Sequence, residues 1–316
     1  MTRQITIGTR ASPLALAQTE QIVTALQGAV GLPAGAVSVR KISTKGDEIL
    51  DRTLAEIGGK GLFTDELNAG LRDGSIDLAV HSLKDLPTAE TPGLFTAAIP
   101  VREDPRDILI VATPDGPTPG SLAELPEGVR VGTASLRRKA QILQARPDLG
   151  IAPLRGNIGT RLAKLSPNTV AATVLAMAGL NRMGYTGPDW QALAPDIMLP
   201  AAGQGALAVQ CRADDAALIA QLAVLDDDGT RACVTAERSF LAGLDGSCRT
   251  PIAALAIPDP GNAQTALLHG RLLAEDGREF VESMCRFDPA DLDAAGAAGA
   301  QLAAELRSRA PHLVTA

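Results

Sequence analysis

The segment Val129-Arg130-Val131-Gly132-Thr133-Ala134-Ser135-Leu136-Arg137-Arg138 places an apolar stretch, a Gly-Thr turn and a basic stretch in a row. The N-terminus has the same order, because Ile5-Thr6-Ile7 leads into Gly8-Thr9-Arg10 and then into Ser12-Pro13. In each segment we predict a strand and then a helix that begins after the serine, since Ser is a favoured N-cap and Pro fits the first helical position. Helix N-termini offer free N–H groups and the positive end of the helix dipole. The repeat therefore predicts two lobes with anion sites that face each other across a cleft.

The pattern around these two segments predicts an α/β fold. Strand-like stretches occupy 37–42, 76–81, 108–111 and 170–175, and helical patterns occupy 63–71 and 176–183. Two breaks, REDPRD at 102–107 and PAAGQGA at 200–206, are predicted to carry the chain from one lobe to the other and back. A helix over 234–244, hairpin strands over 252–257 and 265–273, and a helix over 288–309 predict a smaller α+β unit. We expect three domains: residues 1–100 with 200–225, residues 101–199, and residues 226–316.

Composition excludes several classes of protein. The 316 residues carry a formal net charge of −7, which argues against a nucleic-acid-binding surface formed by the chain as a whole. The cysteines at positions 211, 233, 248 and 285 form no CxxC pair and the three histidines are widely spaced, so we expect no metal site. Neither a signal peptide nor a long apolar run is present, and we therefore expect a protein of the reducing cytoplasm with no membrane partner.

One cysteine lies in a turn that suits a reactive thiol. The segment Asp245-Gly246-Ser247-Cys248-Arg249-Thr250-Pro251 combines turn-forming residues with a cation next to the sulfur. Arg249 can ionise the Cys248 thiol in part, which makes it a nucleophile or an attachment point. The alternative is a buried structural cysteine, the commonest role of a free cysteine.

A second candidate follows the predicted strand 76–81, where Ser82-Leu83-Lys84-Asp85-Leu86-Pro87 forms a loop. Ligands bind at the ends of parallel strands in α/β sheets. Asp85 is thus either a functional acid next to Lys84 or part of a solvated turn. The glycine-rich stretch 43–62, which contains Lys45 and Lys60, is either a mobile lid or a plain surface loop.

Positive residues are concentrated in the turns. In an acidic protein such a set predicts a polyanionic ligand, since Arg binds carboxylate or phosphate through two parallel hydrogen bonds. For any single Arg, the alternative is a surface salt bridge. Neither a G-x-x-x-x-G-K-[ST] loop nor a G-x-G-x-x-G behind a strand occurs, so nucleotide binding is not supported. The cations are Arg10, Lys45, Lys60, Lys84, Arg137, Arg138, Arg155, Arg161 and Arg182.

The chain resembles the porphobilinogen deaminase family over nearly its full length. The matching segments are TRASPLAL (9–16), GGKGLF (58–63), AVHSLKDLP (79–87), REDPRD (102–107), GTASLRR (132–138), LRGNIGTR (154–161), AGLNRMG (178–184), PAAGQGA (200–206), TAER (235–238) and DGSCRTP (245–251). The resemblance implies two α/β domains similar to type II periplasmic binding proteins, joined by two crossing segments, and a smaller α+β C-terminal domain.

The resemblance also implies an activity and a cofactor. The family joins four porphobilinogen molecules head to tail with loss of ammonia and then releases hydroxymethylbilane by hydrolysis, a transferase reaction of porphyrin and haem biosynthesis. Its primer is a dipyrromethane cofactor held by a thioether to the cysteine that matches Cys248. Its catalytic aspartate matches Asp85. We expect a cytoplasmic monomer that acts on the small molecule porphobilinogen.

The same correspondence assigns ligand-binding positions. Those implied for the cofactor are Cys248, Lys84, Thr133, Ser135, Arg137, Arg138, Arg155, Asp47 and Gly205. Those implied for the substrate are Arg10, Ser12, Lys60, Arg155, Arg161, Arg182 and Gln204. The chain departs from the family pattern at Lys45, Glu56, Asp65 and Ala134.

One competing hypothesis belongs to a different class of protein. A cytoplasmic small-anion binding or sensor protein could use the two-lobed fold without chemistry, because fold alone does not separate binding modules from enzymes. The cysteine turn and the third domain favour the enzyme, since a two-lobed binder needs neither.

Overall fold

The computed structural model describes residues 4–31, 33, 35–44, 46, 61–112, 120–187, 190–244 and 250–314. The chain divides into two compact units. The first consists of Met1–Asp51, Gly59–Glu103 and Gly205–Arg231, and the second of Arg52–Gly58, Asp104–Gln204 and Ala232–Ala316. Among the residues described, none of the helices combines the length and apolar character that a membrane span requires.

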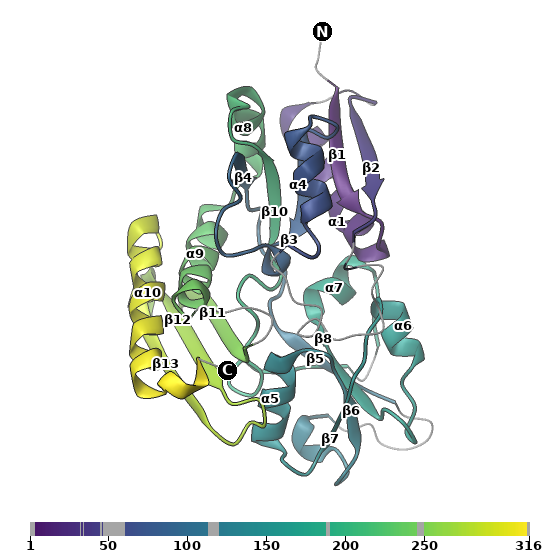
Figure 1. The fold of residues 1–316 in the computed structure, drawn as a ribbon, viewed down its shortest axis with the longest axis vertical. Helices are drawn as coiled ribbons and strands as arrows, with labels where there is room; N and C mark the ends of the chain where they lie inside the picture. Colours follow the sequence, from purple (N-terminus) through teal and green to yellow (C-terminus); the bar gives the residue numbers. More distant parts are fainter. Residues whose placement is uncertain are drawn as a thin grey trace. The chain divides into compact units, whose positions relative to one another are not determined.

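The first unit is built on a mixed five-stranded sheet with the order β2-β1-β3-β10-β4 (Figure 1). Strand β1 runs parallel to β2 and β3, whereas β10 runs antiparallel to β3 and β4. Its elements are β1 (Ile5–Arg10), α1 (Pro13–Val30), β2 (Val37–Ile42), α4 (Asp65–Arg72), β3 (Leu78–Ser82), the 3-10 turn η1 (Leu83–Asp85), β4 (Leu94–Ala98), β10 (Leu207–Arg212), α8 (Ala216–Leu222) and η3 (Ala223–Leu225).

Helices α1 and α4 cover opposite faces of this sheet. Leu78 and Val80 of β3 pack in the same apolar cluster as Ile22 of α1, whereas Ala79 packs with Leu67 of α4. Successive side chains of a strand point to opposite faces, so this alternation places one helix on each side.

Helix α1 begins as the sequence predicts. Ser12 is the N-cap, its Oγ accepts a hydrogen bond from Ala15 N at 3.3 Å, and Pro13 is the first helical residue. The helix ends at Gly31, whose φ of 68° lies in the left-handed region that glycine enters at low cost.

The second unit contains a mixed sheet with the order β7-β6-β8-β5-β9. Strand β6 runs parallel to β7 and β8, and β5 runs antiparallel to β8 and β9. The elements of this part are β5 (Asp107–Val111), the 3-10 turn η2 (Leu122–Glu124), β6 (Arg130–Gly132), α5 (Leu136–Ala145), β7 (Gly150–Ala152), α6 (Ile158–Ala163), β8 (Ala172–Ala176), α7 (Met177–Arg182) and β9 (Gln191–Ala192).

The two five-stranded sheets have corresponding arrangements, although their strands do not follow one another in the same order along the chain. In each, the strand that contains the Gly of the Gly-Thr pair, β1 or β6, is second, and an antiparallel strand, β10 or β5, is fourth. Gly8, Thr9 and Arg10, where the sequence predicts a turn, all belong to β1 and pair with β2, so the first strand is longer than predicted. The internal repeat predicted from the sequence is therefore present in the fold, and the predicted α/β class is confirmed.

The second unit also contains the C-terminal part of the chain, a three-stranded antiparallel sheet with two helices. Gly299 lies so close to the neighbouring helix that a Cβ there would be 2.2 Å from Ala236 O, so the two helices pack backbone to backbone. Phe240 is fully buried between the sheet and the helices. The elements are α9 (Asp228–Gly243), β11 (Ile252–Asp259), β12 (Asn262–Leu273), β13 (Phe280–Phe287), α10 (Leu292–Arg309) and η4 (Pro311–Leu313). This α+β part was predicted, and the division into three separate domains stays a prediction.

Candidate active site

Asp85 lies where the sequence predicts it, at the end of β3 in the first unit. Its Oδ2 atom is 3.7 Å from Nη1 of Arg10, and both side chains are partly exposed. The Arg10 guanidinium also lies over the Phe63 ring, 4.1 Å from the ring centroid. Asp85 is therefore an accessible carboxylate beside a cation that a cation–π contact helps to hold in place.

Asp85 and Arg10 line a small pocket together with the polar residues Gln18, His81 and Ser82 and with apolar residues that include Phe63. Gln18 Nε2 donates to Ser82 Oγ at 2.9 Å. His81 is 5% exposed, and within the described residues its Nε2 atom has no hydrogen-bond partner. Burial and the charge of Arg10 lower the pKa of His81 to about 4, against a weaker opposing hydrogen bond to Gln210. At neutral pH the pocket thus contains a neutral imidazole, a residue that sequence reasoning did not select.

The state of His81 predicts a dependence of stability on pH. His81 takes up a proton near pH 6.5 in the unfolded chain but only near pH 4 in the folded chain. Protonation of the unfolded chain therefore lowers the unfolding free energy as the pH falls from 6.5 toward 4, whereas above pH 6.5 this loss is absent. Between pH 7 and pH 5 we expect the wild type to lose about 2 kcal/mol more unfolding free energy than His81→Asn. Urea unfolding at both pH values measures this difference. The control is the exposed His312→Gln, and equal pH slopes in the wild type and His81→Asn would contradict the prediction.

The Gly-Thr turn of the second unit begins helix α5 in the predicted manner. Ser135 is the N-cap, and its Oγ accepts from Arg138 N at 3.4 Å. Ser135 N donates to Thr133 Oγ1 at 3.1 Å, and Thr133 N donates to Ala152 O at 2.9 Å. These hydrogen bonds fix the conformation of the turn before α5. The family resemblance implies that Thr133 and Ser135 lie near the cofactor.

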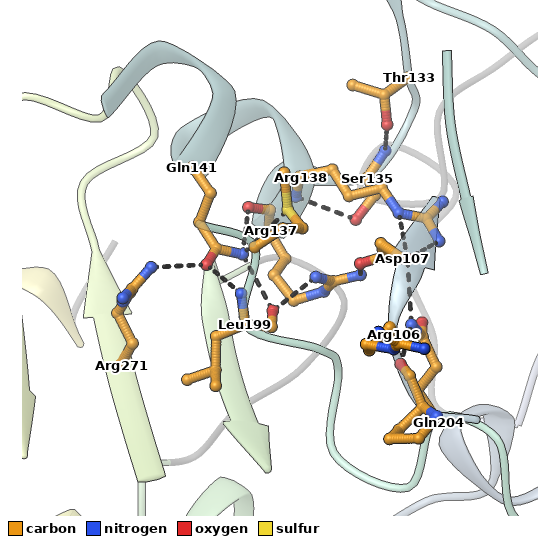
Figure 2. A network of polar contacts seen from close by, with 12 residues as sticks. Arg106, Asp107, Thr133, Ser135, Arg137, Arg138, Gln141, Leu199, Gln204 and Arg271 are labelled. Atoms are coloured by element: carbon orange, nitrogen blue, oxygen red, sulfur yellow. Dashed lines mark hydrogen bonds and ion pairs between the residues drawn. The ribbon is translucent and has the colours of Figure 1, made fainter. Parts of the chain in front are cut away.

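Arg137 and Arg138 are buried and share one carboxylate. Arg137 Nη2 lies 2.8 Å from Asp107 Oδ2, and Arg138 Nη2 lies 2.7 Å from Asp107 Oδ1 (Figure 2). Asp107 is fully buried at the start of β5. Cations at a helix N-terminus need a compensating anion, and the sequence argument assigned that anion to a ligand. The structure shows that the Asp107 carboxylate supplies one negative charge. Asp107, Arg137 and Arg138 together therefore keep a net charge of +1.

Three arginines form a cluster of positive charge. Burial, and the charges of Arg138 and Arg155, lower the pKa of Arg161 to about 10. Arg161 Nε donates to Gly156 O at 2.8 Å. In the described part of the chain, Nη1 of Arg155 is buried without a hydrogen-bond partner. Guanidinium groups whose positive charges act on Arg161 in this way form a site suited to carboxylates, which fits the polyanionic ligand predicted from the sequence.

The remaining predicted residues have varied positions. Gln204 is buried, and its Nε2 atom donates to Pro105 O at 2.7 Å and to Asp107 Oδ1 at 3.0 Å, so its amide supports the Asp107 cluster. Gly205 is buried with a φ of 89° and accepts from Glu103 N at 3.3 Å. Lys84 is exposed, and Arg182 is the last residue of α7. Cys248, Asp47, Lys45 and Lys60 lie outside the described residues, and the predicted cleft between the lobes stays a prediction.

Three of the four cysteines lie within the described residues. Cys211 and Cys233 are buried and Cys285 is partly buried. Burial and Asp215 raise the pKa of the Cys211 thiol to about 11, and burial and Glu305 raise the pKa of Cys285. Such thiols stay protonated and are poor nucleophiles.

Sequence reasoning did not select Asp107, which pairs with Arg137 and Arg138, or His81, which lines the pocket with Asp85. Asp107 belongs to REDPRD, which was interpreted only as a crossing between lobes. The sequence did contain a signal, because Asp107 directly precedes the apolar stretch 108–111. A carboxylate at the start of a buried strand needs a cation or a hydrogen-bond donor as its partner.

Some solved structures are similar to part of the chain. The BvgS VFT2 domain of Bordetella pertussis is 17% identical with a TM-score of 0.40, covering 70% of this chain and 85% of that one. A YaeC-family lipoprotein of Enterococcus faecalis is 12% identical with a TM-score of 0.40, covering 72% of this chain and 93% of that one.

Similarity in sequence is much closer. The family described as "Porphobilinogen deaminase, dipyromethane cofactor binding domain" matches residues 5–220, and "Porphobilinogen deaminase, C-terminal domain" matches residues 231–308. The porphobilinogen deaminase of Roseiflexus castenholzii is 48% identical over 298 residues, which is 93% of this chain and 95% of that protein. That of Paracoccus denitrificans is 48% identical over 308 residues, which is 97% of this chain and 95% of that protein. With most of its length matched in this way, the chain belongs to the porphobilinogen deaminase family.

Proposed function

We propose that this chain is a hydroxymethylbilane synthase that condenses four porphobilinogen molecules head to tail with loss of ammonia, and then releases hydroxymethylbilane by hydrolysis. Membership of the porphobilinogen deaminase family supports the reaction, and the family's dipyrromethane-binding domain supports the cofactor. When bound through Cys248, the dipyrromethane supplies the free pyrrole end to which the first substrate ring is joined.

The observation that carries the proposal is the cluster of Arg138, Arg155 and Arg161. Each pyrrole ring of cofactor and substrate bears two carboxylates. This cluster offers the buried Arg138 and the partly buried Arg155 and Arg161, and an anion would relieve the repulsion that Arg138 and Arg155 exert on Arg161. We assign the cofactor carboxylates to Arg138 and Arg155, and those of incoming or growing chain to Arg155 and Arg161. Further cofactor contacts are assigned to Lys84, Thr133, Ser135, Arg137, Asp47 and Gly205, and further substrate contacts to Arg10, Ser12, Lys60, Arg182 and Gln204.

Asp85 is assigned the catalytic role. Its carboxylate accepts hydrogen bonds from pyrrole N–H groups, and it stabilises the positive charge that develops on the reacting ring as ammonia departs. Arg10 orients this carboxylate from 3.7 Å and adds a cation for substrate carboxylates. The neutral His81 beside them adds no charge to the pocket at neutral pH.

The proposal includes a monomer that acts in the cytoplasm on small molecules and not on nucleic acid or membranes. The net charge of −7 supports this choice of partner, because a polyanion of nucleic-acid size is repelled by the chain as a whole. Size-exclusion chromatography with light scattering measures the oligomeric state directly.

Intact mass of the purified protein tests the proposed function. Protein made in cells that synthesise porphobilinogen should carry the additional mass of two linked pyrrole rings, should colour with Ehrlich's reagent after denaturation, and should convert porphobilinogen to bilane. A folded protein with unmodified mass and no turnover would instead support the small-anion binding protein as the alternative.

A further inference from the structure

A continuous set of hydrogen bonds connects the C-terminal sheet to the first turn of α5 (Figure 2). It starts at Arg271 on β12, which is 3% exposed. Arg271 Nη1 donates to Gln141 Oε1 at 3.0 Å, Nη2 donates to Asp196 O at 3.0 Å, and Nε donates to Glu282 at 2.7 Å. The guanidinium is thus held in one orientation by three different acceptors.

Gln141 transmits this orientation to the backbone at Leu199. Gln141 is fully buried on α5, and its side-chain amide bonds both polar backbone groups of Leu199. Leu199 N donates to Gln141 Oε1 at 2.8 Å, and Gln141 Nε2 donates to Leu199 O at 3.1 Å. A buried amide with every group bonded fixes its neighbours in a single arrangement.

Leu199 in turn fixes Arg137. Its carbonyl oxygen accepts from Arg137 Nη1 at 2.7 Å, while Arg137 Nη2 pairs with Asp107 at 2.8 Å. The position of the Arg137 guanidinium is therefore defined from two sides, one of which depends on Gln141 and Arg271.

The hairpin between β12 and β13 contacts α5 directly. A Cβ at Gly277, whose φ is 72°, would lie 2.4 Å from Ala140 O and 2.4 Å from Gln144 N, so hairpin and helix meet backbone to backbone. Lys139 and Glu275 form an ion pair at 3.5 Å across the same contact. Apolar side chains would suffice to hold such a junction together, since replacing both partners of a buried hydrogen bond by apolar groups of the same shape can be nearly neutral or stabilising. The three fixed hydrogen bonds of Arg271 therefore indicate that it orients α5 relative to the C-terminal sheet, and does not only hold the two elements together.

The sheet that contains Arg271 is also close in the sequence to the predicted attachment cysteine. Strand β11 begins at Ile252, four residues after Cys248 in the sequence, and Ala253 of β11 pairs directly with Arg271 of β12. The strand that follows Cys248 in the sequence thus pairs with the strand that, at Arg271, contacts the helix with the predicted cofactor-binding arginines.

We propose that Arg271 is a positioning residue for cofactor binding. Acting through Gln141 and Leu199, it holds Arg137 at a fixed place relative to the sheet that follows Cys248, so that the dipyrromethane carboxylates meet the arginines while the thiol is joined. This inference rests on the proposed function, because it assigns the network to the cofactor of that reaction.

The test measures cofactor loading and not only activity. Apoprotein from cells unable to make porphobilinogen is incubated with porphobilinogen, and the gain of two pyrrole rings is followed by intact mass. Arg271→Met should load about tenfold more slowly than the wild type, since a displacement of 1 Å can cost as much as about a hundredfold in rate. Arg271→Lys should also load slowly while it folds normally, because Lys keeps the charge and lacks the fork that bonds Gln141 and Asp196 together.

Two further variants separate orientation from stability. Arg286→Met is the matched control, since Arg286 lies on β13 of the same sheet, its side chain is 66% exposed, and its ion pair is with Asp259. This variant should load at the wild-type rate. Arg271→Met combined with Gln141→Met should recover thermal stability through an apolar contact and should still load slowly.

Each outcome decides a separate point. Loading of Arg271→Met and Arg271→Lys at the wild-type rate would overturn the inference, and so would a double variant that recovers both stability and loading. Failure of the wild type itself to gain the two rings would refute the proposed function, whatever the variants do.

Discussion

Cys248→Ala is expected to give protein of unmodified mass that forms no bilane. The proposed thioether requires a sulfur at this position, and in the sequence DGSCRTP the next residue is the cation Arg249, which favours the thiolate. The other thiols in the described residues are poor substitutes, because burial raises the pKa of both Cys211 and Cys285. Intact mass and an assay of porphobilinogen consumption measure the two effects together.

Cys285→Ala is the matched control for this experiment. Cys285 is only partly buried, so it is the most accessible of the described thiols, and its Sγ donates to Ala298 O at 3.7 Å. The control should keep the two-ring mass and near-normal turnover. If Cys248→Ala retained the additional mass, or if Cys285→Ala lost it, the attachment would have to be assigned to another residue.

The elements that the sequence predicts well are those with a local signal. The bounds of β2 agree with the predicted strand over 37–42, and α1 and α5 begin after the predicted serine caps. A cap is a hydrogen bond within a few residues, so the sequence around it contains the necessary information. For the same reason, the repeated order of an apolar strand, a Gly-Thr pair and a serine-capped helix was sufficient to predict an internal repeat.

The elements that were missed depend on partners far away in the sequence. Strand β10 follows a glycine-rich turn and is defined by its pairing with β3 and β4. Strand β9 is two residues long, too short for any periodic pattern. Strand β13 has the sequence FVESMCRF, which lacks the alternation of apolar and polar residues that predicts a strand, and among the described strands it pairs with β12 alone. Its strand conformation therefore depends on the sheet more than on its own sequence pattern.

The same distinction explains the site. The local sequence predicts that Arg137 and Arg138 lie at the start of a helix. It does not indicate which carboxylate of REDPRD is buried. Asp104 binds Arg106 at 2.7 Å near the surface, whereas Asp107 enters β5, pairs with Ala176 of β8 and is covered on all sides. Only the tertiary fold brings Asp107 within bonding distance of both arginines, and only the fold brings Arg271 to Gln141.

The second large effect is expected at Asp85. Asp85→Ala should lower the turnover number by a factor on the order of a hundred to ten thousand, the range typical of a lost acid–base group, while the two-ring mass of the cofactor is retained. The cofactor is assigned mainly to arginines of the second unit and to Cys248, whereas Asp85 lies in the first unit beside Arg10. Asp85→Asn, which keeps the size and loses the charge, should be nearly as slow if the carboxylate charge is what stabilises the reacting ring.

Asp73→Asn provides the comparison, because Asp73 is an exposed carboxylate of the same unit that accepts only a local hydrogen bond from Ser75 N at 2.8 Å. It should leave turnover and mass unchanged. A slow Asp85→Ala with a normal cofactor mass, next to a normal Asp73→Asn, would place the chemistry at the end of β3. Near-normal bilane production by Asp85→Ala would remove Asp85 from the catalytic role. The pocket formed by Arg10, Gln18 and His81 would then be a site for substrate carboxylates, because a cation and neutral hydrogen-bonding groups would be all that remains there to act on the substrate.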